Sequence, residues 1–303
     1  MVARAFPVAE AIAVTGASGF VGRHVVQRLA HAGASVRAVV RNPSGDVAGA
    51  AVIQADLLEV ATLAPALAGI KSLIHCAAIT ADHKEPFPGA YRRVNAEGTR
   101  NLVWAARRAG VEKIVLLNGL GTRRGSDRSY MRTRWEMSEA VRNSGLPWVA
   151  LQPSILFGDR APYPAALARL ARQFPVMPVL GGSRRLQPLW VEDLVSCLTM
   201  AAGSSQWDGR SIDLGGPDQL TYREMTKLVM DTIGVHRPMV PLPPSLARVP
   251  ARVMALLPNP PLVPATLELF DFDNVTQPDV VEETFGFQPR RITDHFLANG
   301  LDG

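Results

Sequence analysis

The sequence predicts an α/β protein whose strands form a doubly wound parallel sheet. Two observations favour this class. Short apolar runs alternate with segments of helical periodicity over the first half of the chain, and the first run passes through a glycine-rich turn into a helix. Strands covered by helices on both faces are apolar along their whole length. A ligand is then expected outside the carboxyl ends of the strands.

The stretch Ala11–Gly22, AIAVTGASGFVG, has the strand, turn and helix order of a dinucleotide site. Gly16 permits the tight turn, Gly19 lets the backbone approach a diphosphate, and Gly22 lets the helix pack close to the strand. The N–H groups that begin the helix then face the phosphates. The pattern predicts a Rossmann-type fold with cofactor contacts at Thr15, Gly16, Ser18, Gly19, Phe20, Val21 and Gly22.

The second predicted strand, Ser35–Val40, ends at Arg41, and no acidic residue follows before Asp46. In dinucleotide sites a carboxylate near this position binds the ribose 2′-hydroxyl of NAD, whereas an arginine accommodates the 2′-phosphate of NADP. The sequence therefore favours NADP(H), with NAD(H) as the alternative, and Arg41 as the phosphate contact. The simpler interpretation of Arg41 is a solvated loop arginine.

Two further strands are predicted at Ala51–Gln54 and Ser72–Cys76. Asp56 follows the first of them, where its carboxylate either accepts from the adenine amino group or caps the next turn. Ala77 and Ala78 follow the second, and their small side chains leave room for a flat ring or a ribose against the backbone. We predict cofactor contacts at Asp56, Leu57, Ala77 and Ala78.

Helices are predicted near Val60–Ala68 and over Tyr91–Arg108, the second ended by Gly110, and a fifth strand follows at Lys113–Leu117. Asn95 lies in the second helix among apolar positions. It is interpreted either as a hydrogen-bonded amide in the core or as a further cofactor contact.

Composition excludes several classes of function. The 303 residues are 47% hydrophobic and 19% charged, which is enough to bury a large core. The net charge of +5 comes from 28 arginines and 4 lysines that are spread along the chain, and no basic-aromatic recognition module is present. We therefore expect no nucleic-acid partner.

Membrane-spanning and metal-binding classes are also disfavoured. Prolines interrupt the apolar stretch Val253–Leu267, and no signal-peptide pattern precedes the first strand. Cys76 and Cys197 lie in apolar surroundings, so neither a disulfide nor a metal site is expected. The expectation is a cytoplasmic protein. In the proline-rich segment Pro238–Pro264, packing over the cleft is favoured over a partner-binding or membrane-surface helix.

Several motifs together resemble the extended and atypical short-chain dehydrogenase/reductases, which include epimerase/dehydratase-like proteins. They are TGASGFVG, AD at 55–56, HCAA at 75–78, VNAEGT at 94–99, Tyr130 and QPSILFG at 152–158. Residues 129–158 are similar to the branch that contains the NADPH-binding accessory subunit of respiratory complex I and its bacterial relatives. The resemblance implies a nucleotide-binding domain over 1–153, to which later segments return, and a smaller α/β substrate lobe over 154–303. It also implies cofactor contacts at Pro153 and Ile155.

The resemblance further implies where the chemistry occurs. In this family a tyrosine is the general acid or base for hydride transfer, a lysine four positions later lowers its pKa, and a serine or threonine after the fifth strand holds the substrate oxygen. Residues four apart share a helix face, so the cation favours the phenolate. Here Arg134 stands in the lysine position after Tyr130, and Thr122 or Asn118 replaces the serine. Arginine keeps the charge but cannot pass a proton.

Tyr130 therefore has three interpretations: a working acid/base helped by Arg134 and Thr122, a cofactor contact in a protein that turns over little, or a plain surface tyrosine. The favoured function is an oxidoreductase that passes hydride between NADP(H) and a small carbonyl or alcohol substrate. The alternatives are an epimerase or dehydratase that recycles its cofactor, and a non-catalytic NADPH-binding protein with a structural or sensing role.

The second half of the chain predicts helices at Tyr163–Gln173 and Val191–Ala202 and a strand at Val176–Leu180. Five arginines lie in loops that the resemblance places near the mouth of the cleft. They are solvated side chains in the simpler interpretation and contacts to an anionic substrate in the other: Arg123, Arg124, Arg128, Arg184 and Arg185.

Overall fold

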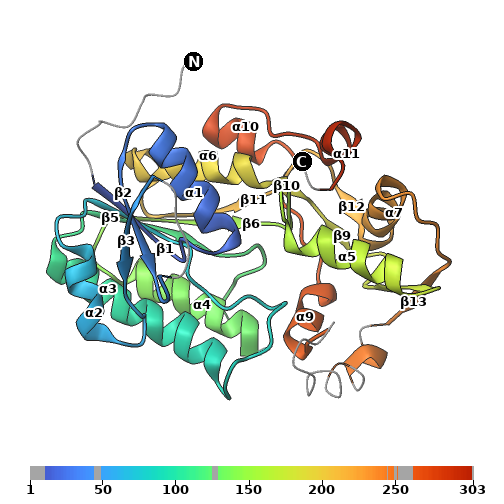
Figure 1. The fold of residues 1–303 in the computed structure, drawn as a ribbon, viewed down its shortest axis with the longest axis horizontal. Coiled ribbons are helices and arrows are strands. Elements are labelled where there is room, and N and C mark those ends of the chain that lie inside the picture. The colour runs from blue at the N-terminus through green and yellow to red at the C-terminus, as the bar shows by residue number, and fades with distance from the viewer. Residues whose placement is uncertain are drawn as a thin grey trace. The chain divides into compact units, whose positions relative to one another are not determined.

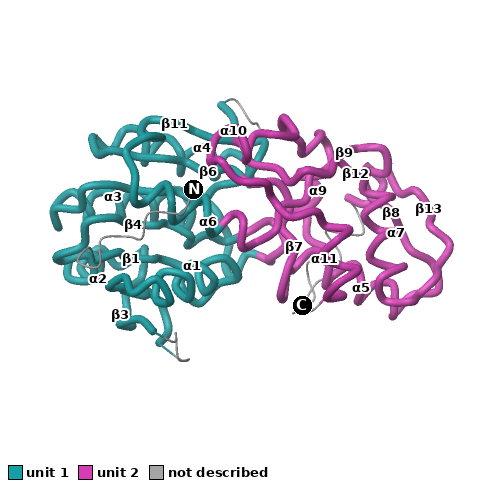
Figure 2. The backbone as a smooth tube through the Cα atoms, turned by 90° about the horizontal axis from the view of Figure 1, so that it is seen from above, with its two compact units in different colours: residues 1–79, 85–152, 195–212 teal, residues 80–84, 153–194, 213–303 magenta. Residues whose placement is uncertain are grey.

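The computed structural model describes residues 11–43, 49–124, 129–243, 245–248, 251 and 262–301. They form two compact units, which Figure 2 shows in teal and magenta. The first unit comprises residues 1–79, 85–152 and 195–212, and the second comprises residues 80–84, 153–194 and 213–303. The chain therefore passes between the units several times, and each unit is built from segments that are distant in the sequence.

A seven-stranded sheet forms the centre of the first unit, in the order β11-β6-β5-β4-β1-β2-β3 (Figure 1). The strands run parallel, and β1 lies between β2 and β4, since Ile12 pairs with both Val36 and Ser72. The direction of winding changes at β1 and β4, the position where such sheets bind ligands. The strands are β1 (Ala11–Thr15), β2 (Ser35–Val40), β3 (Ala51–Gln54), β4 (Ser72–His75), β5 (Lys113–Leu117), β6 (Trp148–Pro153) and β11 (Arg210–Leu214).

Helices cover both faces of this sheet, as Figure 1 shows. On one face lie α1 (Phe20–His31) and α6 (Val191–Ala202), where the guanidinium of Arg28 donates to the hydroxyl of Ser196. On the other face α2 (Val60–Leu67), α3 (Gly98–Ala109) and α4 (Ser129–Arg142) share one apolar core with the strands. The predicted doubly wound α/β fold is confirmed.

The predicted helix Tyr91–Arg108 consists of two helices of different pitch. A π-helix, η1 (Tyr91–Glu97), leads directly into α3, which ends at Gly110 in the left-handed conformation with a φ of 76°. The backbone N–H of Tyr91 donates to Glu85 Oε1 at 2.9 Å. Short π segments are rare and recur at functional sites. This one contains the fully buried Asn95.

The second unit combines short helices with three strand pairs. β7 (Leu156–Phe157) is parallel to β10 (Leu189–Trp190), β8 (Met177–Leu180) is parallel to β13 (Met239–Leu242), and β9 (Arg185–Leu186) is antiparallel to β12 (Leu220–Thr221). Phe157, Met177 and Ile292 are fully buried in its core. The helices are α5 (Pro162–Gln173), α7 (Tyr222–Thr232), α9 (Pro264–Glu268), α10 (Val280–Phe285) and α11 (Ile292–Asn299).

The described residues also include two short 3-10 turns, η2 (Ser205–Trp207) and η3 (Leu269–Asp271), and residues 245–248 are helical. Within the predicted segment 238–264, β13 occupies residues 239–242, whereas residues 244, 249–250 and 252–261 lie outside the described part of the chain. No helix in the described ranges is long and apolar enough to cross a bilayer.

Candidate functional site

Backbone packing excludes a side chain at two of the three glycines between β1 and α1. Gly16 has a φ of +66°, and a Cβ there would lie 2.7 Å from the backbone nitrogen of Ala77. A Cβ on Gly22 would lie 2.1 Å from the carbonyl oxygen of Gly16. Gly16 is therefore required because the ends of β1 and β4 approach closely, and Gly22 because α1 packs on the turn.

Gly19 differs from these two because its backbone is extended, with a φ of −76°. It is exposed, and among the described residues a Cβ there would contact only the carbonyl oxygen of Gly16, at 3.1 Å. Gly19 is the N-cap of α1, whose first turn carries no acidic residue and receives no side-chain cap within the described ranges. The first N–H groups of an α-helix have no intrahelical partner and attract anions. The turn thus fits the diphosphate of a dinucleotide.

The other predicted residues of the turn differ in exposure. Ser18 is exposed and Phe20 is half-buried, whereas Thr15 and Val21 are buried.

Arg41 follows β2, the neighbour of β1, and its side chain is exposed. Its carbonyl oxygen accepts a hydrogen bond from Gln54 Nε2 at 3.1 Å. Both interpretations of Arg41, a phosphate contact and a solvated loop arginine, stay predictions.

Asp56 caps the turn that leads to α2. Its Oδ1 accepts from the N–H of Leu58 at 2.8 Å, and its own N–H donates to Thr62 Oγ1 at 3.1 Å. Leu57 is buried against Gly98, where a Cβ would come within 2.8 Å of the Leu57 Cβ. The capping role of Asp56 is thus present in the structure, and its contact with adenine stays a prediction.

Asn95 fixes the segment that follows β4. Its amide Nδ2 donates to the carbonyl oxygen of Ile79 at 2.9 Å, and its Oδ1 accepts from the N–H of Ile79 at 2.8 Å. Asn95 is therefore a hydrogen-bonded amide in the core. Through Ile79 it holds Ala77 and Ala78 beside the glycine turn, and the contact of these residues with the cofactor stays a prediction.

Sequence reasoning missed His75, the last residue of β4. Its imidazole is fully buried, with Nδ1 at 2.7 Å from the hydroxyl oxygen of Thr15 and Nε2 at 2.9 Å from that of Thr99. Burial and, to a smaller extent, the charge of Arg134 lower the pKa of His75 from 6.5 to about 3, so the imidazole is neutral at pH 7. Its position in the apolar run SLIHCAA was the available signal.

Asn118 attaches the end of β5 to α4. Its Nδ2 donates to the carbonyl oxygen of Arg134 at 2.9 Å and to Ser138 Oγ at 2.7 Å, and its Oδ1 accepts from the N–H of Gly119 at 3.1 Å. The hydroxyl of Thr122 donates to the carbonyl oxygen of Gly119 at 2.7 Å. Both predicted replacements for the family serine thus have hydrogen-bond partners, Thr122 in the loop and Asn118 in the loop and in α4. Their contact with a substrate stays a prediction.

Tyr130 and Arg134 are both buried, one turn apart in α4, with exposed fractions of 6% and 5%. The ring of Tyr130 packs edge-on against Tyr91, with 5.5 Å between ring centroids. The interpretation of Tyr130 as a plain surface tyrosine is therefore wrong. The reason is that η1 packs against the start of α4 and covers the ring, a contact between segments about forty residues apart.

Arg134 is a buried cation that has no carboxylate partner in the described part of the chain. Its Nη2 lies 3.4 Å from the carbonyl oxygen of Leu117 at the end of β5, and its Nη1 lies 3.8 Å from Met137 Sδ. Its Nε is buried and has no hydrogen-bond partner among the described residues. Buried charged groups are normally paired and hydrogen-bonded. Within the described part of the chain, Arg134 departs from this rule.

The model of a family described as NAD(P)H-binding matches residues 16–173, a range that includes the glycine turn and α4. The chain belongs to the NAD(P)H-binding family. The predicted relationship to NAD(P)-binding proteins, among them the respiratory complex I subunit, is thereby confirmed.

Relatives of this family member include reductases and a respiratory subunit. Ceramide reductase of Caulobacter vibrioides is 31% identical over 62% of this chain and 59% of its own length. NADH dehydrogenase (ubiquinone) 1 alpha subcomplex subunit 9 of Arabidopsis thaliana is 24% identical over 94% of this chain and 74% of its own length. An uncharacterized protein of Mycobacterium tuberculosis is 28% identical over 92% of this chain, which spans only 28% of the length of that protein.

Two solved structures of similar fold align with nearly the whole length of this chain. The crystal structure of gox2253 has a TM-score of 0.76 and 27% identity, and covers 97% of this chain and 96% of its own. MoeE5 in complex with UDP-glucose and NAD has a TM-score of 0.72 and 21% identity, with 96% and 97% covered. The second likeness shows the fold alone.

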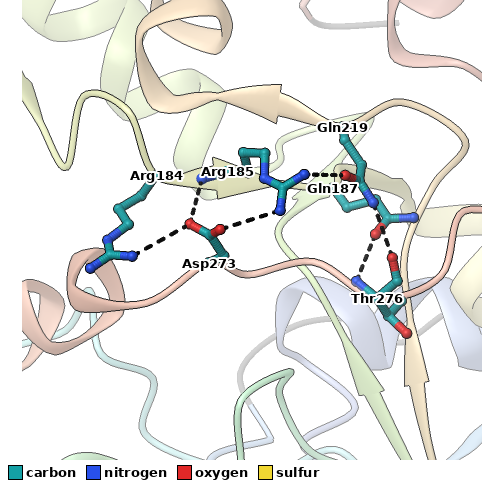
Figure 3. Close-up of polar contacts among 6 residues, drawn as sticks. All are labelled: Arg184, Arg185, Gln187, Gln219, Asp273 and Thr276. Atoms are coloured by element: carbon teal, nitrogen blue, oxygen red, sulfur yellow. Dashed lines mark hydrogen bonds and ion pairs between the residues drawn. The ribbon is translucent and has the colours of Figure 1, made fainter.

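In the second unit of this family member, Asp273 pairs with two of the predicted arginines (Figure 3). Arg185 Nη2 lies 3.4 Å from Asp273 Oδ2, and Arg184 Nη1 lies 3.9 Å from Asp273 Oδ1. Arg185 Nη1 also donates to Gln219 Oε1 at 3.1 Å. Arg123 and Arg124 are exposed, and Arg128 lies outside the described residues. A role for these side chains in binding an anionic substrate stays a prediction.

Pro153 and Ile155 belong to the second unit. Pro153 ends β6, and the carbonyl oxygen of Ile155 accepts from the N–H of Leu189 at 2.9 Å. Their contact with the cofactor stays a prediction, as does the division of the chain into a nucleotide domain over 1–153 and a substrate lobe over 154–303. No group of His, Cys, Asp and Glu side chains in the described part of the chain is arranged to hold a metal ion.

Proposed function

We propose that this family member is an NADPH-dependent reductase in which Tyr130 exchanges a proton with a small carbonyl or alcohol substrate. The observation that carries the proposal is a buried phenol one helical turn before a buried guanidinium whose Nε has no partner among the described residues. A buried polar group left unpaired costs free energy of folding, and such groups concentrate at functional sites.

The glycine turn and the ends of β2, β3 and β4 would hold the cofactor. The diphosphate would lie at the open side of Gly19, against the N–H groups of the first turn of α1. Arg41 favours NADP(H) over NAD(H), because a guanidinium binds the 2′-phosphate through paired, charge-assisted hydrogen bonds. Asp56 and Ala78 would contact the adenosine and the ring or ribose.

The chemistry of the chain would be proton transfer and charge stabilisation. When bound, the reduced nicotinamide supplies the hydride. Tyr130 donates its hydroxyl proton to the substrate carbonyl oxygen, which yields the alcohol and leaves a phenolate. Arg134 stabilises that phenolate electrostatically and keeps its own protons, because a guanidinium is not deprotonated in proteins. Thr122 is the proposed donor to the substrate oxygen, for which its hydroxyl proton would have to turn away from the carbonyl oxygen of Gly119. Asn118 holds the end of β5 on α4.

Two observations from the relatives bear on the alternatives. The relationship to ceramide reductase favours reduction over epimerisation or dehydration. The relationship to a subunit of NADH dehydrogenase over 94% of this chain supports the second candidate, a protein that binds NADPH and plays a structural or sensing role. The two candidates share the glycine turn and differ in whether Tyr130 exchanges a proton.

Replacement of Tyr130 by Phe tests the catalytic candidate. We expect NADPH oxidation with a panel of carbonyl compounds to fall by about 10²- to 10⁴-fold, the usual contribution of a general acid, with an almost unchanged dissociation constant for NADPH. The matched control is Tyr222→Phe, which removes a hydroxyl from a tyrosine of similar burial in the second unit. Equal activity of Tyr130→Phe and wild type would remove Tyr130 from the mechanism. Tight NADPH binding without oxidation by any carbonyl compound would favour the non-catalytic candidate.

A further inference from the structure

A continuous chain of buried hydrogen bonds joins three parts of the nucleotide site through His75. The hydroxyl of Thr15, the residue before Gly16, lies 2.7 Å from His75 Nδ1. On the other side of the ring, His75 Nε2 lies 2.9 Å from the hydroxyl of Thr99 in the first turn of α3. That hydroxyl lies 2.5 Å from the carbonyl oxygen of Asn95 in the π-helix η1.

The positions of the protons follow from the chemistry of the acceptors. A carbonyl oxygen cannot donate, so the single hydroxyl proton of Thr99 points to Asn95. The oxygen of Thr99 is left to accept a hydrogen bond, which requires a proton on His75 Nε2. A neutral imidazole then has a bare Nδ1, which accepts from the hydroxyl of Thr15. Every group in the chain is thereby satisfied with His75 neutral.

We propose that His75 is a positioning residue of the nucleotide site, acting as a neutral imidazole with its proton on Nε2. It ties the glycine turn, through Thr15, to the π-helix that carries Asn95. Asn95 in turn brackets the backbone of Ile79 and so fixes the strand end that lies against Gly16. The proposal rests on the proposed function in one respect, that NADPH is the ligand that this turn binds.

The geometry explains why one side chain affects the whole turn. All four members of the chain are buried to within 1% of complete burial. The approach of Gly16 to Ala77 leaves no room for a Cβ, so a small shift of β1 against β4 moves the backbone that faces the diphosphate. Such a shift weakens the hydrogen bonds between this backbone and a ligand, because the strength of a hydrogen bond falls steeply as its angle departs from linear.

Substitutions at Thr99 separate positioning from general stability. Thr99→Val keeps the shape of the side chain, removes the hydroxyl and leaves the His75 Nε2 proton without an acceptor, whereas Thr99→Ser keeps the hydroxyl. The control is Thr226→Val in α7, a threonine of 2% exposure whose hydroxyl likewise donates to a carbonyl oxygen four residues earlier, at 2.7 Å.

We expect Thr99→Val to weaken NADPH binding by about tenfold in a fluorescence titration, the equivalent of one lost hydrogen bond to a buried group. Thr99→Ser should restore the affinity. Thr226→Val should lower the melting temperature by a similar amount to Thr99→Val, with the affinity unchanged. Equal NADPH affinity of Thr99→Val and wild type would overturn the proposal, and so would an equal loss of affinity in Thr226→Val.

The tautomer of His75 is measured without any cofactor. In a long-range ¹H–¹⁵N correlation spectrum of the isotope-labelled protein, we expect His75 Nε2 to be the protonated nitrogen and Nδ1 the bare one, at pH 6 as at pH 8. A proton on Nδ1 would refute the proposed chain whether or not NADPH binds. Failure of the wild-type protein to bind NADPH, with the Nε2 tautomer observed, would instead count against the proposed function.

Discussion

Arg134 brings a permanent charge into the first unit at a position where the resemblance expects lysine. A guanidinium is more weakly hydrated than an ammonium group, so its burial at 5% exposure costs less free energy of desolvation. It also offers five N–H donors. Among the described residues, Nη2 donates to the carbonyl oxygen of Leu117 and Nη1 contacts the sulfur of Met137. In the proposed mechanism the guanidinium would therefore keep the electrostatic role of the cation, and any proton relay would use another group.

We propose that the choice between NADPH and NADH also depends on a single residue, Arg41. Removal of the Arg41 guanidinium in Arg41→Ala should weaken NADPH binding by about 10- to 100-fold, the value of a hydrogen bond to a charged group, and should leave NADH binding nearly unchanged. Arg107→Ala, which removes an exposed arginine at the end of α3, is the control for the loss of a positive charge. Parallel titrations with both cofactors measure the effect. Equal losses for NADPH and NADH would show that Arg41 does not contact the phosphate.

Elements set by local pattern were predictable from the sequence. The strands Ser35–Val40, Ala51–Gln54 and Lys113–Leu117 have the predicted bounds. The helix α3 also ends before Gly110, as predicted. These strands and this helix end depend on apolar runs and turn residues within a few positions, which a sequence shows directly. The need for glycine at Gly16 and Gly22 was likewise predictable, because the turn motif specifies the close backbone packing that excludes a side chain at both positions.

Contacts between distant elements were not predictable. Thr15 and His75 are sixty residues apart, and neither local periodicity nor a motif places a histidine between two threonines. The π-helix was also missed, because the sequence pattern of residues 91–108 predicts one continuous helix. Asn95 and Asn118 were recognised as polar residues near the site, while their hydrogen bonds to backbone were not foreseen.

The link between β1 and β4 makes stability depend on pH. The pKa of His75 is about 3 in the folded protein and 6.5 in the unfolded chain, so between these values the unfolded state binds one more proton. The stability due to neutral His75 is fully present above pH 6.5 and is lost as the pH falls toward 3. Between pH 7 and pH 5 this single group should lower the free energy of unfolding by about 2 kcal/mol.

Urea denaturation of wild type and His75→Asn at the two pH values isolates this effect. Asparagine does not titrate, and contributions from other groups cancel in the comparison. The stability difference between wild type and variant should therefore shrink by about 2 kcal/mol at pH 5. A difference that stays constant from pH 7 to pH 5 would mean that the pKa of His75 is not lowered in the folded state.

At the scale of the whole molecule, the chain crosses between the two units at 79/80, 84/85, 152/153, 194/195 and 212/213. Unfolding of one unit alone would leave the other with several long loops closed at both ends, each with a cost in chain entropy. The likeness to gox2253 over 97% of this chain covers both units together. We therefore expect the two units to unfold as one cooperative structure, and a ligand of the first unit to stabilise the second.

Hydrogen exchange with and without NADPH tests this expectation. At a free NADPH concentration one hundred times the dissociation constant, mass action raises the free energy of unfolding by about 2.7 kcal/mol, which slows exchange by globally opening amides about 100-fold. The slowing should appear in β1 and β5 of the first unit and equally in α5 and α7 of the second.

The matched variant is Gly19→Asp. Its extended backbone accepts a side chain once the carbonyl oxygen of Gly16, 3.1 Å from the added Cβ, shifts by a few tenths of an ångström. The new carboxylate can cap α1, yet its negative charge would occupy the diphosphate position. This variant should fold and gain no protection from NADPH. Slowing confined to the first unit would show that the two units open independently. In that case NADPH would stabilise the first unit and leave the free energy of opening of the second unit unchanged, despite the five chain connections between them.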